Sequence, residues 1–404
     1  MAEILERNGF MVKMKVEVPV GDVKKAYDAV VREYASKYRF PGFRPGKAPA
    51  KVVEARLGRE ALLEEVKERL LDSSYPQAVR ELELLPVGVK LVEAKLEEDA
   101  PFVYVAEVEN YPEVKLPDWT AFSLEIEKPE ITDEMVSKAL EELRQRYGEL
   151  VTVERPIEAG DQVFIETEDG SRFPVSMENA LEHVREALMG RSAGEEVMVP
   201  VKDGDTVVRE IKTKITEVKA LQLPELDDEF AKTVGEEDLA TLTAKVRESL
   251  EGQAGREVRN RKANLFVDKL AEGMEVEIPP TMQAREEQHL LQHLAEELKA
   301  QKIEFNAYIH NLEQEGKLEE FKTKLREDAA RSIRRSLARE KLAEDLGTVF
   351  TDEEWASYVV DLARAYRTNP NALQQELGEE TLARLRIQRL HDKAVMEALE
   401  RIGA

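Results

Sequence analysis

The sequence predicts a multidomain α+β protein with a small β-rich module inserted into a discontinuous helical domain, behind an α+β N-terminal unit. Three observations lead to this prediction. Strand patterns flank helical patterns in residues 1–110, strand patterns dominate residues 151–221, and helical patterns fill residues 222–404. Runs of strands followed by runs of helices are typical of α+β proteins with separate domains.

The N-terminal unit, predicted to span residues 1–110, begins with a half-buried strand. In residues 11–19, Val12, Met14, Val16 and Val18 alternate with charged side chains, which is the period of a strand. Helical spacing follows over 22–38, 49–57 and 59–84, and strand patterns over 88–97 and 101–110. Because strands lie at both ends with helices between them, we expect an antiparallel sheet.

Residues 111–150 are predicted to form a linker and the first part of the helical domain. Two prolines in residues 111–119 indicate an extended segment, and residues 122–127 have a short strand pattern. A helix begins after Thr132, which is a favourable N-cap. The apolar face of this helix has no helical neighbour before residue 222, so we expect it to pack on later helices. This expectation makes residues 151–221 an insertion.

The module at 151–221 and the helical domain at 222–404 have distinct patterns. The module has strand, turn and strand over 160–175, one short helix within 177–190, and two strands over 195–218 joined by an Asp-Gly turn. The helical domain has apolar stripes over 239–270 and 318–346, a capping box of Thr351 with Glu354, and a last helix ending near Ile402. Helices with a narrow apolar face and a charged opposite face favour thin, extended helical layers. An ordinary helical bundle remains an alternative.

The absence of cysteine excludes disulfide and thiolate chemistry, and the distribution of charge indicates an anionic partner. There is no cysteine, so disulfides and thiolate catalysis are excluded, and we expect a cytoplasmic protein with no membrane partner. Residues 1–60 carry thirteen Lys and Arg against eight Asp and Glu, a net charge of +5, so the rest of the chain carries −29. This asymmetry favours docking on an anionic surface through the N-terminal end. A solvated basic face is the alternative.

The motif search yields no catalytic centre and no expected cofactor or metal. Only three residues separate Gly42 from Gly46, and alanine follows Lys47, so the stretch fails as a phosphate-binding loop. His289 and His293 share a helix face, but the metalloprotease pattern needs Glu at position 290 and Leu stands there. The sequence therefore favours an interaction protein over an enzyme.

The stretch "GFRPGKAP" at residues 42–49 resembles the signature of the bacterial trigger factor family, the ribosome-associated chaperones. Its six fixed positions are all present: Gly42, Phe43, Arg44, Gly46, Lys47 and Pro49. Residues 111–117, 223–235 and 276–288 resemble further landmarks of the family in the same order. The resemblance spans the whole chain.

This resemblance implies a chaperone that uses no ATP and docks beside the ribosomal exit tunnel, on a ribosomal protein and adjacent RNA. The ribosome-binding residues would be the six signature residues with Pro45. Phe43 would supply an apolar plug and Arg44 a bidentate contact. The helical domain would shelter nascent polypeptides and assist folding and export, and the module would be an FKBP-like prolyl isomerase. The sequence does not decide whether a homodimer forms away from the ribosome.

The chain departs from the family pattern in two places. Pro45 stands where the family often has lysine, which removes a cation and fixes the backbone φ. In the module, Val184 replaces a family phenylalanine and a short turn at 202–205 replaces a long flap. Phe164 and Phe173 are the module's only aromatic residues, so we predict weak or absent isomerase activity. A residual pocket would be lined by Phe164, Phe173, Leu181, Val184 and Leu188.

Two other functions remain open from the sequence. One is an enzyme whose main activity is prolyl isomerisation, against which the reduced module argues. The other is a scaffold that binds the ribosome or nucleic acid through the basic end. The strongly acidic remainder of the chain argues against this second alternative.

Overall fold

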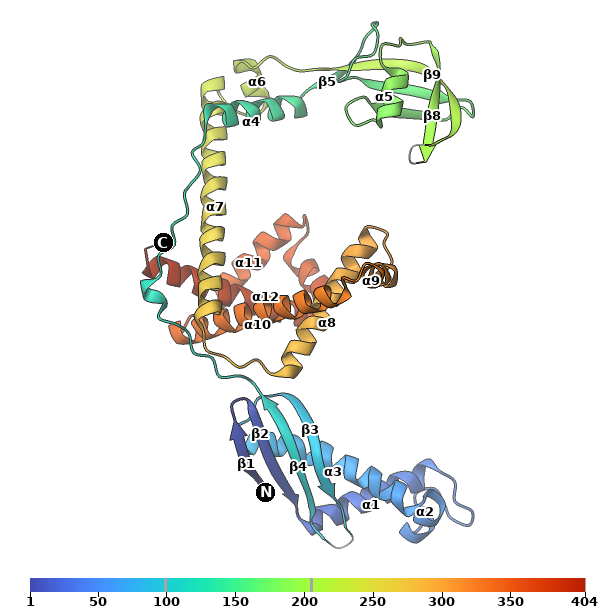
Figure 1. Ribbon diagram of the computed structural model, residues 1–404, viewed down its shortest axis with the longest axis vertical. Coiled ribbons are helices and arrows are strands. Elements are labelled where there is room, and N and C mark those ends of the chain that lie inside the picture. The colour runs from blue at the N-terminus through green and yellow to red at the C-terminus, as the bar shows by residue number, and fades with distance from the viewer. Residues whose placement is uncertain (98–99, 204–205, 404) are drawn as a thin grey trace. The chain divides into compact units, whose positions relative to one another are not determined.

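The computed structural model describes residues 1–97, 100–203 and 206–403 (Figure 1). The chain forms two compact units, one of Met1–Glu125 with Arg261–Ala404 and one of Ile126–Asn260. Mixed helix and sheet in separate parts of the chain confirm the predicted α+β multidomain class. The domain boundaries at residues 110, 150 and 221 stay predictions.

The N-terminal sheet is antiparallel throughout and has the strand order β1-β2-β4-β3. Its strands are β1 (Ala2–Asn8), β2 (Met11–Val18), β3 (Pro86–Lys95) and β4 (Phe102–Asn110). Helices α1 (Val20–Lys37), α2 (Ala50–Leu57) and α3 (Arg59–Glu81) contribute to one core with the sheet. Met14, Phe102 and Tyr104 are among its most deeply buried side chains. The strand β1 was not expected from the sequence.

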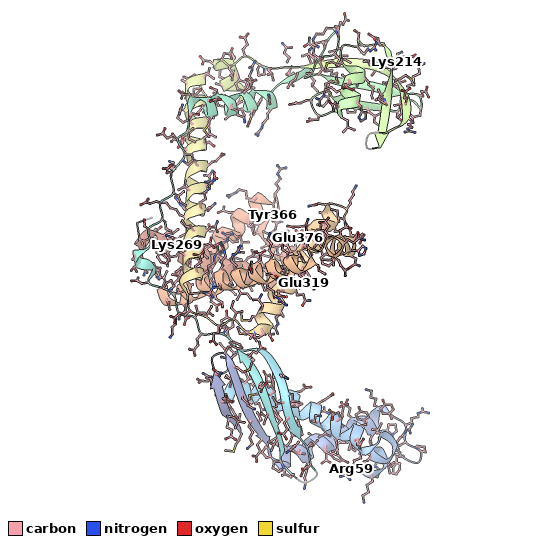
Figure 2. All side chains as sticks on the ribbon, viewed as in Figure 1. Arg59, Lys214, Lys269, Glu319, Tyr366 and Glu376 are labelled. Carbon is pink, nitrogen blue, oxygen red and sulfur yellow. The ribbon has the colours of Figure 1, made fainter. Side chains whose placement is uncertain are left out.

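The linker does not contain the strand predicted at 122–127, so that prediction is wrong. A single 3₁₀ turn, η1 (Trp119–Ala121), precedes an extended segment. Phe122 lies edge-on to Phe266 with ring centroids 5.8 Å apart, and Leu124 is buried in the helical core. Lys269, labelled in Figure 2, donates to the Ser123 carbonyl at 2.9 Å. The apolar alternation therefore reflects packing on a helix rather than pairing in a sheet.

The second unit contains the predicted lone helix, α4 (Asp133–Arg146), whose N-cap Thr132 accepts a hydrogen bond from the Met135 amide. α4 packs on α6 (Asp228–Thr233) and on the first half of α7 (Leu239–Gly273). Val136 and Leu140 of α4 meet Phe230 and Leu242 in this cluster. Helices from after residue 222 thus cover the apolar face of α4.

The module is a five-stranded antiparallel sheet with one short helix, α5 (Glu182–Leu188). Its strands are β5 (Glu149–Thr152), β6 (Gln162–Thr167), β7 (Arg172–Ser176), β8 (Glu196–Asp203) and β9 (Thr206–Gln222). Glu149 pairs with Gln222, so the chain enters and leaves the module at adjacent backbone positions. Gly204 and Asp205, in the turn predicted at 202–205, lie outside the described residues.

The helical part of the first unit contains residues 261–273 of α7 and, in its described residues, five further helices. They are α8 (Pro280–Ala300), α9 (Phe305–Gln314), α10 (Leu318–Leu346), α11 (Asp352–Ala365) and α12 (Pro370–Arg401). Thr351 and Glu354 form the predicted capping box at the start of α11. Gly378 interrupts α12 with a φ of 74°, a kink that was not predicted. Of the helices in the described part of the chain, none has the length and apolar character needed to cross a membrane.

Candidate functional site

The loop between α1 and α2 presents the signature residues to solvent. Phe43 is 42% exposed, although phenylalanine is usually buried, and Arg44, Pro45 and Lys47 beside it in the chain are also exposed. Pro49 lies at the N-cap position of α2, where its fixed φ suits the start of a helix. The tip of the loop therefore combines one apolar ring with two cations.

Two glycines give this loop its shape. Gly42 has a φ of 84° and Gly46 a φ of 75°, a region that other residues rarely adopt. The Phe43 amide donates to the Phe40 carbonyl at 3.1 Å, and the Lys47 amide to the Arg44 carbonyl at 3.0 Å. The Gly46 amide donates to the Ala35 carbonyl of α1 at 2.8 Å. These bonds define two successive turns and tie the second one to α1.

The base of the loop is packed against α2 through residues that the sequence did not single out. Phe40 is 5% exposed, and the Arg56 guanidinium lies over its ring, 5.2 Å from the centroid. Arg56 also donates a hydrogen bond to the Arg39 carbonyl. Because Arg56 and Arg39 are 17 positions apart, no local pattern in the sequence could have revealed this contact.

Glu33 of α1 and Glu65 of α3 have partners outside the loop. Glu33 forms an ion pair with Arg69 at 3.0 Å, and Glu65 accepts a hydrogen bond from the Tyr34 hydroxyl at 2.9 Å. The hydrogen bond to Glu65 is the largest cause that raises the pKa of Tyr34. In the part of the chain that the structure describes, Arg44 and Lys47 form no ion pair. Their charges therefore stay available for an external anion.

The structure does not bring all five residues proposed for a residual isomerase pocket together. Ile165 pairs with Phe173 and Phe164 with Pro174, so Phe164 and Phe173 lie on opposite faces of the sheet. Phe173 is 49% exposed and Leu181 67% exposed. Leu188 is fully buried and Val184 packs beside it in the module core. The Lys219 ammonium lies over the Phe164 ring, 5.2 Å from its centroid.

The histidine pair on α8 is exposed and lies beside carboxylates of its own helix. His289 lies 3.9 Å from a Glu286 oxygen and His293 3.3 Å from a Glu297 oxygen. Within residues 1–97, 100–203 and 206–403, no group of three metal-ligating side chains comes together. Exposed contacts of this kind contribute little to stability.

Comparisons with known proteins match the whole length of the chain. Two family models match, "Bacterial trigger factor protein (TF)" at residues 1–143 and "Bacterial trigger factor protein (TF) C-terminus" at residues 238–400. A trigger factor of Thermus thermophilus is 55% identical over 404 residues, 100% of both chains. That of Deinococcus deserti is 37% identical, covering 100% of this chain and 94% of the relative.

One solved structure has the same fold over its full length. It is described as "Promiscuous Substrate Recognition in Folding and Assembly Activities of the Trigger Factor Chaperone". The TM-score is 0.67 at 24% sequence identity, and the match covers 100% of both chains.

Proposed function

This chain belongs to the bacterial trigger factor family, and we propose that it is an ATP-independent chaperone that docks at the ribosomal exit tunnel and shelters nascent polypeptides. Loop 40–49 is the docking element. The observation that carries this proposal is the tip of the loop, where Phe43 and Arg44 are exposed on a backbone fixed by hydrogen bonds. An apolar ring beside a guanidinium suits a ribosomal protein next to RNA.

The rest of the molecule supports docking through one end. Net charge on the chain is −24, so RNA repels most of its surface, whereas the segment from Arg32 to Lys51 is rich in cations and contains one acid, Glu33. Because Glu33 is already paired with Arg69, the loop keeps its positive potential. The ribosome would therefore meet the chain in one orientation.

Client binding would be passive and spread over many weak contacts. Tyr366 is 70% exposed and Val349 65% exposed, and Ile387 adds a further exposed apolar side chain on α12. Each such contact stabilises a complex by roughly 1 kcal/mol or less, from about 25 cal/mol per Å² of apolar surface. Clients can therefore dissociate without nucleotide hydrolysis, and the acidic surface keeps the complex soluble.

The central module would act mainly as an additional binding surface. Its two phenylalanines lie on opposite faces of the sheet, which supports a low rate of prolyl isomerisation. An apolar pocket that removes water from the prolyl bond is needed to lower the barrier. Isomerisation would thus be a minor activity beside sheltering.

Ribosome co-sedimentation of the full chain and an Arg44→Ala variant tests the docking proposal. We expect Arg44→Ala to weaken binding by about 10- to 150-fold, since a charge-assisted contact is worth roughly 1.5–3 kcal/mol. Arg80→Ala is the matched control, because it removes one exposed arginine of the same domain from the last turn of α3, away from the loop and without releasing Glu33. Equal pelleting of Arg44→Ala and the wild type would mean that the loop is not the docking element.

A further inference from the structure

We infer that Arg56 of α2 is a positioning residue that holds loop 40–49 in its docking shape, an inference that rests on the proposed function. Arg56 makes two contacts at the same point of the chain. Its guanidinium lies over the Phe40 ring, with 5.2 Å from Cζ to the centroid, and it donates to the carbonyl of Arg39. Together they fix both the side chain and the backbone where the loop leaves α1.

The chemistry of these two contacts needs arginine. A planar guanidinium can stack on a ring with its face while an N–H group at its edge donates to a carbonyl. A lysine ammonium is a compact charge, so it can lie over the ring or bind the carbonyl but serves both poorly. Phe40 is only 5% exposed, and the Arg56 guanidinium over its ring helps to cover this apolar surface.

Phe40 is joined to the tip of the loop by a backbone hydrogen bond. The Phe40 carbonyl accepts the hydrogen bond from the Phe43 amide at 3.1 Å and so closes the first turn. The Gly46 amide, bonded to the Ala35 carbonyl, anchors the second turn to α1. Arg56 acts at the first of these two anchors. Without it, Phe43 and Arg44 would sample more conformations, and docking would include the free-energy cost of ordering them.

Salt dependence separates this role from a direct contact with RNA. Each phosphate contact that a cation makes changes the slope of log affinity against log salt concentration by roughly 0.7–0.9. A residue that only positions the loop changes the affinity but leaves this slope unchanged. Arg56 is exposed, so a direct contact is sterically available and must be tested.

The test measures ribosome affinity at several salt concentrations, together with amide hydrogen exchange of the free full-length chain. For Arg56→Ala we expect an affinity loss of about tenfold, a slope equal to that of the wild type, and about tenfold faster exchange at the Phe43 amide. Arg56→Lys should stay close to Arg56→Ala. Arg80→Ala, which removes an exposed arginine from the last turn of α3, should leave all three quantities unchanged.

A second variant keeps the inference falsifiable if Arg56→Ala unfolds the domain. Phe40→Leu retains an apolar side chain at the buried position but removes the ring under the guanidinium. We expect it to accelerate exchange at the Phe43 amide with an unchanged salt slope. Unchanged exchange in Phe40→Leu and Arg56→Ala would overturn the inference, as would full recovery by Arg56→Lys or a smaller slope in Arg56→Ala.

Arg44→Ala separates failure of this inference from failure of the docking proposal. If Arg44→Ala loses affinity while Arg56→Ala does not, the loop docks but Arg56 does not position it. If Arg44→Ala retains full affinity, the docking proposal fails. In that case, amide hydrogen exchange at Phe43 in Arg56→Ala still tests whether Arg56 orders the loop.

Discussion

The proposed docking loop and the central module both have few aromatic side chains, yet their backbones arrange them differently. In the loop, two glycines with positive φ and three backbone hydrogen bonds present Phe43 at one defined point. In the module, the strand register sends Phe164 and Phe173 to opposite faces of one sheet. Possession of aromatic residues is therefore a poor guide to a site, because a site requires that side chains converge or are held in place.

The largest expected effect contrasts a buried and an exposed phenylalanine. Phe102 of β4 is fully buried in the N-terminal core, whereas Phe173 of β7 is 49% exposed. Phe102→Ala should lower the free energy of unfolding of the N-terminal sheet by about 4 kcal/mol. Phe173→Ala should lower that of the module by about 0.5 kcal/mol or less. Hydrogen exchange of each sheet in the full chain measures both, and similar losses would refute the contrast.

The sequence predicted elements well where a pattern had one structural cause. The alternation of Val12, Met14 and Val16 became β2, and the capping box of Thr351 formed as expected. Failures occurred where tertiary partners decided the outcome. The alternation of Phe122 and Leu124 arises from packing on helices, and β1 has no alternation because it is an edge strand with little burial.

In the candidate site, too, local features could be predicted from the sequence and tertiary contacts could not. The signature residues of the loop could be named from the sequence because they are contiguous. The contact of Arg56 with Phe40 could not, since it depends on how α2 folds back beside the end of α1. In the module, the residue types were known but their faces depended on the register of β6 and β7.

The second prediction tests how the loop backbone is held. A Cβ on Gly46 would lie 3.0 Å from Oγ of Ser36, whereas a Cβ on Gly42 would meet no atom within 4 Å. Both alanine variants strain a positive φ, at about 1 kcal/mol, and Gly46→Ala should cost about 1 kcal/mol more. Denaturant unfolding of the N-terminal domain measures the difference. Adding Ser36→Ala should restore part of the stability of Gly46→Ala; no recovery would exclude the hydroxyl as the cause.

The third prediction concerns the electrostatics of the loop. Pro45 stands where the resemblance to the family leads us to expect lysine, and it restricts the backbone between Arg44 and Gly46. Pro45→Lys should steepen the salt dependence of ribosome affinity by roughly 0.7–0.9 in slope, the value of one phosphate contact. Affinity at low salt should rise by only a few fold, because the freed backbone must then be ordered. An unchanged slope would mean that a cation at position 45 contacts no phosphate, so that Pro45 does not weaken the electrostatic part of docking.

The smallest expected effect is that of phenylalanine substitutions in the module on prolyl isomerisation. Spontaneous prolyl isomerisation takes roughly 10–100 s at 25 °C, so refolding of a proline-limited substrate reports catalysis directly. We expect the wild-type chain to accelerate this refolding only weakly. Phe164→Ala and Phe173→Ala should each change the rate by less than about twofold, because the two rings lie on opposite faces of the sheet and do not line one pocket together. A family member with an aromatic-lined module serves as the positive control. If the wild type accelerated refolding as much as this control, and Phe164→Ala abolished the acceleration, one aromatic ring would be sufficient for catalysis. The module would then be an isomerase despite its divided aromatic residues.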